Sequence, residues 1–125
     1  MRILIVDDQK RTRQSLRILL NTLPAIKEIR EAEHGREAVR LILEARPSIV
    51  VMDGRMPEMD GVEATQIIKA RWPGVKVILL SMYPEYQEAA AQVGADAFVS
   101  KGQPPEELLD TICILHAMSQ GKEER

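Results

Sequence analysis

Polar residues that could bind a phosphate or a metal ion follow four short apolar runs in this sequence. Asp7 and Asp8 follow the first run, Asp53 follows a later one, and Ser81 and Lys101 follow two more. Carboxylate oxygens are ligands for hard divalent cations, whereas a hydroxyl or an ammonium group donates to phosphate oxygens. If the fold brings these five residues together, they form a site for metal-assisted phosphate chemistry.

Three carboxylates in one place impose an electrostatic condition. Two carboxylates about 4 Å apart repel by roughly 4 kcal/mol at an effective dielectric constant of 20. Asp7, Asp8 and Asp53 therefore need a cation among them, or one of them must take up a proton. Lys101 can offset one charge, and the remaining charge favours Mg²⁺, which accepts oxygen ligands and leaves positions for water and phosphate.

Zinc fits the sequence less well. The chain has one cysteine, Cys113, so it can form neither an intrachain disulfide nor a cysteine-based metal cluster. The two histidines, His34 and His116, are expected in helical stretches away from the strand ends. Cys113 lies in an apolar helical pattern, which predicts a buried thiol rather than a reactive one.

The apolar runs alternate with stretches of helical periodicity. Runs rich in β-branched residues predict strands, and apolar residues spaced three or four apart predict helices. The predicted strands cover residues 2–6, 26–32, 48–52, 75–80 and 97–99. The predicted helices cover residues 10–22, 35–45, 61–72, 84–93 and 104–118, with Gly94 placed as a C-cap.

Five strands, each followed by a helix, predict an α/β domain with a five-stranded parallel sheet and helices on both faces. Lys27, Glu28 and Arg30 interrupt the second strand, which an edge position in the sheet would explain. In such a sheet ligands bind where the carboxyl ends of the strands meet, near the switch in strand order. We therefore expect the five polar residues to converge there.

Single residues among them also have ordinary structural explanations. Asp7 and Asp8 could cap the following helix, because Asp is favoured at N-caps. Lys101 by itself could be a solvated surface lysine. Asp60 and Gly61 are more typical of a turn and a helix cap than of catalysis.

Composition excludes several classes of function. The chain has 125 residues, enough for one domain, and a formal net charge of −2 with its 17 Lys and Arg residues scattered. Direct nucleic-acid binding needs a concentrated basic surface, so it is not expected. No apolar stretch approaches the length of a membrane span, and the N-terminus becomes acidic too early for a secretory signal, so we expect a cytoplasmic protein.

Four motifs, in order, resemble the receiver domain of two-component response regulators. They are VDD (residues 6–8), VVMDGRMPEMDG (50–61), LLSM (79–82) and DAFVSKG (96–102). The resemblance covers residues 1–118, with 119–125 as a polar tail or the start of a linker. LLSMYPE and GADAFVSKG are most similar to receivers coupled to LuxR-type helix-turn-helix outputs. The resemblance implies a single flavodoxin-like (βα)5 domain.

The resemblance also implies roles for the polar residues. Asp53 would accept a phosphoryl group from a phosphohistidine of a sensor histidine kinase. The ligands of Mg²⁺ would be Asp7, Asp8, Asp53 and the backbone carbonyl of Arg55. Asp8 would bind the ion directly and Asp7 partly through water. Two further residues would contact the phosphoryl oxygens: Lys101 would pair with one, and Ser81 would hydrogen-bond another.

The same resemblance implies a switch. Ser81 would move toward the phosphoryl group and Phe98 would turn inward, changing an output face within residues 84–118. Phe98 could instead be an ordinary core residue. Arg55 and Tyr83 would flank the route of the hydrolytic water, and their bulk predicts slow self-dephosphorylation. The chain departs from the Lys-Pro pair common in the family, since Gly102 follows Lys101, and a cis bond without proline is costly.

These features predict a phosphoaccepting switch that catalyses only its own phosphorylation and dephosphorylation. It would bind DNA only through an output domain absent from this chain, and a homodimer on phosphorylation is left open. A metal-dependent phosphohydrolase would want a second acid where Arg55 stands. A phosphorylation-independent binding module would not need the complete set of acids and Lys101. A nucleotide binder would need a glycine-rich loop where QKRTRQS (9–15) stands.

Overall fold

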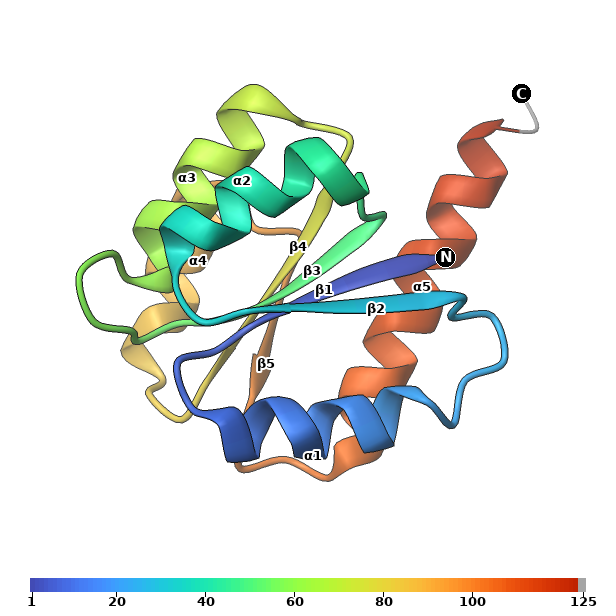
Figure 1. Cartoon of the computed structure of the whole chain (residues 1–125), viewed down its shortest axis with the longest axis horizontal. Helices are drawn as coiled ribbons and strands as arrows, with labels where there is room; N and C mark the ends of the chain where they lie inside the picture. The colour runs from blue at the N-terminus through green and yellow to red at the C-terminus, as the bar shows by residue number, and fades with distance from the viewer. Residues whose placement is uncertain (124–125) are drawn as a thin grey trace.

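Five strands and five helices alternate along the chain (Figure 1). The computed structural model describes residues 1–123, and side-chain surroundings as far as Ser119. The strands are β1 (Arg2–Val6), β2 (Glu28–Ala32), β3 (Ile49–Asp53), β4 (Lys76–Ser81) and β5 (Ala97–Ser100). The helices are α1 (Lys10–Leu20), α2 (Gly35–Ala45), α3 (Gly61–Arg71), α4 (Glu85–Gln92) and α5 (Pro105–Glu123).

The strands form one parallel sheet in the order β2-β1-β3-β4-β5. This is the predicted flavodoxin-like (βα)5 arrangement. From β1 the chain adds β2 on one side and β3 on the other, so the order reverses between β1 and β3. Because Val6 pairs with Met52, the residues that follow them, Asp7 and Asp53, leave the sheet side by side. The switch point is where such sheets bind ligands.

Helices cover both faces of the sheet: α2, α3 and α4 pack on one, and α1 and α5 on the other (Figure 1). Successive strand residues alternate between the two layers, as the pleat requires. Leu4 and Val6 of β1 belong to the core under α2–α4, whereas Ile3 and Ile5 belong to the core under α1 and α5. Burial on both faces explains why β1 is almost wholly apolar.

The polar strand β2 lies at an edge of the sheet, as predicted. It begins at Glu28 rather than at residue 26, and the other strand and helix ends lie within one or two residues of the prediction, apart from α5. That helix continues past residue 118 as far as Glu123, so it takes in most of the predicted tail. The last part of that tail, 124–125, lies outside the described residues.

The prediction of a buried thiol is wrong, because Cys113 is exposed. Helix α5 buries Leu108, Ile112 and Leu115 against the sheet. Cys113 follows Ile112 and is rotated about 100° around the helix axis from it, which places it on the outer side. The surrounding apolar pattern concealed this, because the outer side of α5 also carries the exposed Ile114.

The turn and cap predictions are confirmed. Asp60 is the N-cap of α3, and its Oδ1 accepts the backbone N–H of Glu63 at 2.8 Å. Gly94 follows α4 with a φ of 85°, a conformation that glycine adopts without steric cost. Within the described chain every peptide bond is trans, including the bond between Lys101 and Gly102. No helix in residues 1–123 is both long enough and apolar enough to cross a membrane.

Candidate functional site

The five predicted polar residues converge at the carboxyl edge of the sheet. Asp53 and Ser81 are the last residues of β3 and β4, while Asp7, Asp8 and Lys101 come directly after β1 and β5. Backbone hydrogen bonds continue the ladder past the strand ends. They run from Asp7 N–H to Ala32 O at 3.1 Å, from Gly54 N–H to Leu80 O at 3.0 Å, and from Lys101 N–H to Ser81 O at 3.0 Å. The sheet itself therefore fixes the backbone from which these side chains project.

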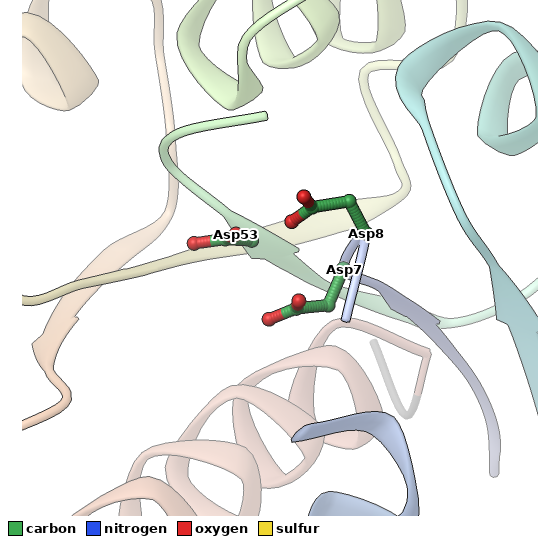
Figure 2. A group of neighbouring side chains, drawn as sticks. All are labelled: Asp7, Asp8 and Asp53. Atoms are coloured by element: carbon green, nitrogen blue, oxygen red, sulfur yellow. The ribbon is translucent and has the colours of Figure 1, made fainter. Parts of the chain in front are cut away.

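The three carboxylates form a cluster at the ends of β1 and β3 (Figure 2). One oxygen from each of Asp7, Asp8 and Asp53 lies within 4.8 Å of the others. Asp7 is 2% exposed and Asp53 is 7% exposed, whereas Asp8 is exposed to solvent. An all-oxygen set of this charge, open on one side, fits a hard divalent cation that keeps some of its water.

Lys101 reaches this cluster from β5, across β4. Its Nζ lies 3.1 Å from Asp53 Oδ1 and 3.4 Å from Asp7 Oδ2. Burial alone would lower the pKa of the Lys101 ammonium, but the charges of Asp53 and Asp7 outweigh burial and raise its pKa above the ordinary value. Lys101 is therefore a stable positive charge in contact with two of the three acids.

The pKa of Asp53 is raised above its ordinary value. Burial is the main cause; Lys101 opposes the increase and the charge of Asp7 adds to it. Without a metal ion, the ionised form of Asp53 is thus held in an environment that disfavours it. A divalent cation among the acids would relieve that condition.

Ser81 is buried beside Asp53, and its Oγ accepts the backbone N–H of Tyr83 at 3.0 Å. Gly54 lies against it. A Cβ at Gly54 would lie 3.2 Å from the Cβ of Ser81 and 3.4 Å from its Oγ. The glycine after Asp53 therefore leaves Ser81 the space to change rotamer.

Arg55 and Tyr83 form a pair at the mouth of the site. The guanidinium carbon of Arg55 lies 5.1 Å from the centroid of the Tyr83 ring, within the range of a cation–π interaction. Both residues line a cavity of about 640 Å³ over the carboxylates. The full lining comprises Asp8, Gln9, Thr12, Asp53, Arg55, Met56, Pro57, Ser81, Met82, Tyr83 and Lys101.

Phe98 lies apart from this cavity. It is partly buried and packs against the core under α2–α4. In this state its contacts are those of a core residue, and its predicted movement is not tested.

Helix capping does not explain Asp7 and Asp8. The N-cap of α1 is Gln9, which makes no side-chain cap hydrogen bond. Asp7 Oδ1 instead accepts the backbone N–H of Gln9 at 2.8 Å, which turns the chain toward α1 and leaves Asp8 facing the cavity.

The prediction that His34 lies away from the strand ends is wrong. It is the N-cap of α2, two residues beyond β2, and its Nδ1 accepts the backbone N–H of Glu37 at 3.2 Å. It shares a cavity of about 240 Å³ with Asp8, Glu33, Pro57 and Glu58. The error came from assigning His34 to the helix itself, whereas an N-cap stands at the same sheet edge as the end of the strand before it.

Gly61 has a role that its sequence context did not reveal. A Cβ at this position would collide with the backbone carbonyl oxygen of Asp53 and would lie 2.9 Å from the Cα of Gly54. Its N–H donates to Gly54 O at 3.0 Å. The start of α3 therefore packs directly on the backbone of the central carboxylate, with room only for glycine.

Known proteins are similar to this chain in sequence. The sequence model for the response regulator receiver domain matches residues 3–113. The chain is 39% identical over 113 residues to the uncharacterized transcriptional regulatory protein YhcZ of Bacillus subtilis, covering 89% of this chain and 53% of that protein. It is 32% identical over 114 residues to the response regulator protein VraR of Staphylococcus aureus, covering 90% of this chain and 54% of VraR.

A solved structure shows the same fold. The two-component response regulator of the LuxR family from Aurantimonas sp. SI85-9A1 superposes with a TM-score of 0.87 at 34% identity, covering 93% of this chain and 85% of that one. The chain spans about half the length of the curated relatives it matches. Motifs, topology and relatives agree, and the chain belongs to the receiver domains of two-component response regulators.

Proposed function

We propose that Asp53 is the phosphoacceptor of this receiver domain and takes its phosphoryl group from a phosphohistidine of a sensor histidine kinase. One observation carries the proposal. The Asp53 carboxylate lies 3.1 Å from the Lys101 ammonium and close to two further acids, at an open cavity. A positioned carboxylate beside fixed positive charge is suited to attack an electrophilic phosphorus atom.

The chemistry is a transfer between two covalent carriers. An oxygen of Asp53 forms a bond to phosphorus while the bond between phosphorus and the imidazole nitrogen breaks, giving an acyl phosphate and a free histidine. Lys101 pairs with charge on the phosphoryl oxygens, and the Ser81 hydroxyl donates a hydrogen bond to another of them. A bound Mg²⁺ would supply further neutralisation of the phosphoryl charge.

The proposed Mg²⁺ ligands are Asp7, Asp8, Asp53 and the backbone carbonyl of Arg55. The three carboxylate oxygens lie close enough to share one ion, and Arg55 lines the same cavity. Oxygen ligands with solvent access suit Mg²⁺, which retains several waters in phosphate-binding sites.

The proposed switch couples the phosphoryl group to residues 84–118. When Ser81 turns toward the phosphoryl group it gives up the hydrogen bond from Tyr83 N–H. The loop before α4 is then free to move, and Phe98 on the neighbouring strand turns inward. The output is a transcription-regulating domain beyond this chain, which contacts DNA on the receiver's behalf; homodimerisation on phosphorylation is one way to transmit the signal.

The proposal includes the sequence-based limits of the domain. Residues 1–118 form the receiver unit and 119–125 the tail or linker, in a cytoplasmic protein. The domain catalyses only its own phosphorylation and dephosphorylation. Arg55 stands where a phosphohydrolase of this kind would place its second acid, which supports a switch over a hydrolase.

Mass spectrometry after incubation with acetyl phosphate and Mg²⁺ tests the phosphoacceptor. One phosphoryl group should appear on the wild-type chain, be lost with EDTA, and be absent from Asp53→Asn. Asp60→Asn is the matched control, since it neutralises an acid at the same sheet edge while Asn caps α3 as well as Asp does. Phosphorylation that survives Asp53→Asn would locate the chemistry elsewhere, and rapid multiple-turnover phosphate release would favour a hydrolase.

The Arg55–Tyr83 pair is proposed to slow self-dephosphorylation by restricting access of water to the acyl phosphate. Replacing both residues with alanine should shorten the half-life of the phosphorylated chain. The half-life is measured by mass spectrometry from the loss of the acyl phosphate over time. An unchanged half-life would remove these residues from the account of phosphoryl lifetime without affecting the assignment of Asp53.

A further inference from the structure

Arg13 is a buried charged residue next to the acid cluster, and no sequence motif pointed to it. It lies in α1 and is only 7% exposed. Its guanidinium reaches three acceptors. Nη1 donates to the backbone carbonyl of Asp7 at 2.8 Å, Nε donates to Glu31 Oε1 at 3.0 Å, and Nη2 lies 3.7 Å from Glu33 Oε1.

The contact between Arg13 and Asp7 matters because the side chains of Asp7 and Asp8 are held in place to different degrees. The Asp7 side chain is fixed on both oxygens, by Gln9 N–H at 2.8 Å and by Lys101 at 3.4 Å. The Asp8 carboxylate is exposed, and among residues 1–119, whose side chains the structure describes, no donor bonds to it. The direction of Asp8 therefore depends on its backbone, and the peptide plane that joins it to Asp7 is held at its carbonyl by Arg13.

Glu31 holds Arg13 in turn. Burial alone would raise the pKa of Glu31, but hydrogen bonds and charge from Arg17 and Arg13 outweigh burial and lower its pKa. Arg17 donates to the other oxygen of Glu31 at 2.8 Å and to Ile29 O at 3.1 Å. The planar fork of a guanidinium can satisfy a carboxylate and a carbonyl at once in fixed geometry, which a lysine cannot.

We propose that Arg13 is a positioning residue that orients the Asp7–Asp8 peptide, and through it Asp8, for metal binding, with Glu31 as its orienting partner. The inference rests on the proposed function only in taking the acid cluster as a Mg²⁺ site. Groups that orient metal ligands without touching the metal commonly change affinity by about 10–100-fold when they are removed.

The sign of the effect separates positioning from electrostatics. Arg13 brings positive charge close to a proposed cation site, so removing its charge should by Coulomb's law strengthen Mg²⁺ binding. Loss of positioning acts in the opposite direction. If an uncharged variant of Arg13 binds Mg²⁺ more weakly, the loss of the arginine charge cannot be the cause.

Isothermal titration of the full chain with MgCl₂ measures this directly. Arg13→Gln should weaken Mg²⁺ binding about tenfold, and Arg13→Lys should recover part of the loss by donating to Asp7 O alone. Glu31→Gln should fall between Arg13→Gln and wild type. Arg17→Gln is the matched control, because it removes a guanidinium from the same carboxylate but none from Asp7, and its affinity should stay within about twofold of wild type.

Thermal unfolding of each variant in EDTA accompanies the titrations. A merely structural role predicts that Arg13→Gln and Arg17→Gln both lose stability while both bind Mg²⁺ as the wild type does, and that result would overturn the proposal. If Arg13→Gln does not fold, unchanged affinity in Arg13→Lys and Glu31→Gln would overturn it equally. A wild-type chain that binds no Mg²⁺ would overturn this inference together with the proposed metal site.

Discussion

Two lysine–aspartate clusters stand at opposite edges of the same sheet. At the amino edge, Lys69 Nζ donates to Pro73 O, Val75 O and Asp96 Oδ2 at 2.9, 2.9 and 3.0 Å. Asp96 Oδ2 also accepts the N–H of Val77 at 2.8 Å, and Lys76 lies 3.8 Å from its other oxygen. The Lys69 ammonium thus has three acceptors, and the Asp96 carboxylate contacts two lysines and a backbone N–H.

The carboxyl edge has the reverse composition. One lysine, Lys101, faces three acids, and Asp8 has no partner among the described residues. Both clusters pair lysine with aspartate, yet the amino edge sets two lysines against one acid, whereas the carboxyl edge sets one lysine against three acids and has an excess of negative charge beside a cavity. This excess suits the carboxyl edge to the proposed cation and phosphoryl group, whereas the amino-edge cluster ties α3 to β4 and β5.

Between the two clusters, the largest expected difference is slower phosphorylation when Lys101 is replaced. Lys101→Met should lower the rate of phosphorylation by acetyl phosphate about 100-fold, because a fixed charge on the transferring group is lost. The rate is measured by mass spectrometry at timed intervals. Lys69→Met should phosphorylate at the wild-type rate, and equal losses in both variants would contradict the division of roles between the two clusters.

Lys69→Met should instead reduce stability. The change leaves the Asp96 carboxylate and two backbone carbonyls without their common donor, at a cost of about 2 kcal/mol. Urea unfolding of the wild type and the variant gives the free-energy difference. A loss below about 0.5 kcal/mol would mean that the amino-edge cluster contributes no more than a surface ion pair.

Asp53→Asn should have the opposite effect on stability. Because the folded pKa of Asp53 is raised, its contribution to stability is complete below its unfolded pKa and is lost as pH rises through its folded pKa. At pH 7 without Mg²⁺ the variant should be more stable by about 1 kcal/mol, a few degrees in Tm. The gain should shrink on acidification, and a variant less stable than wild type at pH 7 would show that Lys101 outweighs the other acids.

Glu31 should give the smallest effect, with the reverse dependence on pH. Its folded pKa is lowered, so its contribution is present above its unfolded pKa of about 4.5 and is lost as pH falls through its folded pKa. Glu31→Gln should cost about 0.5–1 kcal/mol at pH 7, and the difference from wild type should vanish in acid. Urea unfolding at pH 7 and below pH 4 makes the comparison, and a constant difference would argue against the ion pairs with Arg13 and Arg17.

The sequence was sufficient to predict the fold and the convergence of the site residues. Both depend on the periodicity of the apolar residues and on the order of strands and helices along the chain. The apolar strands end on Asp53 and Ser81, and a parallel sheet must bring such ends to one edge. The contacts between individual side chains were harder to predict from the sequence. Nothing in the spacing showed that Lys101 would touch Asp7 as well as Asp53, since that depends on the twist and order of the strands.

The errors share a cause. Cys113 and His34 were each assigned by the average character of their segment, whereas their actual places depend on rotation within a helix or on a single cap. The burial of Arg13 was not predicted at all. Arg13 is the instructive case. An arginine in a polar stretch such as QKRTRQS looks solvated, and its burial becomes favourable only through partners distant in the sequence or on the backbone, Glu31 on β2 and the carbonyl of Asp7.

The contact of Gly61 with the backbone of Asp53 has a consequence for sequence variation. In a library that places every amino acid at every position, position 61 should tolerate only glycine, because every other residue brings a Cβ into a carbonyl oxygen. Gly74, around which a Cβ would meet nothing within 4 Å, should accept many residues. Two glycines of the same chain should thus differ from no tolerance to wide tolerance, and the intolerant one should mark the backbone of the proposed phosphoacceptor.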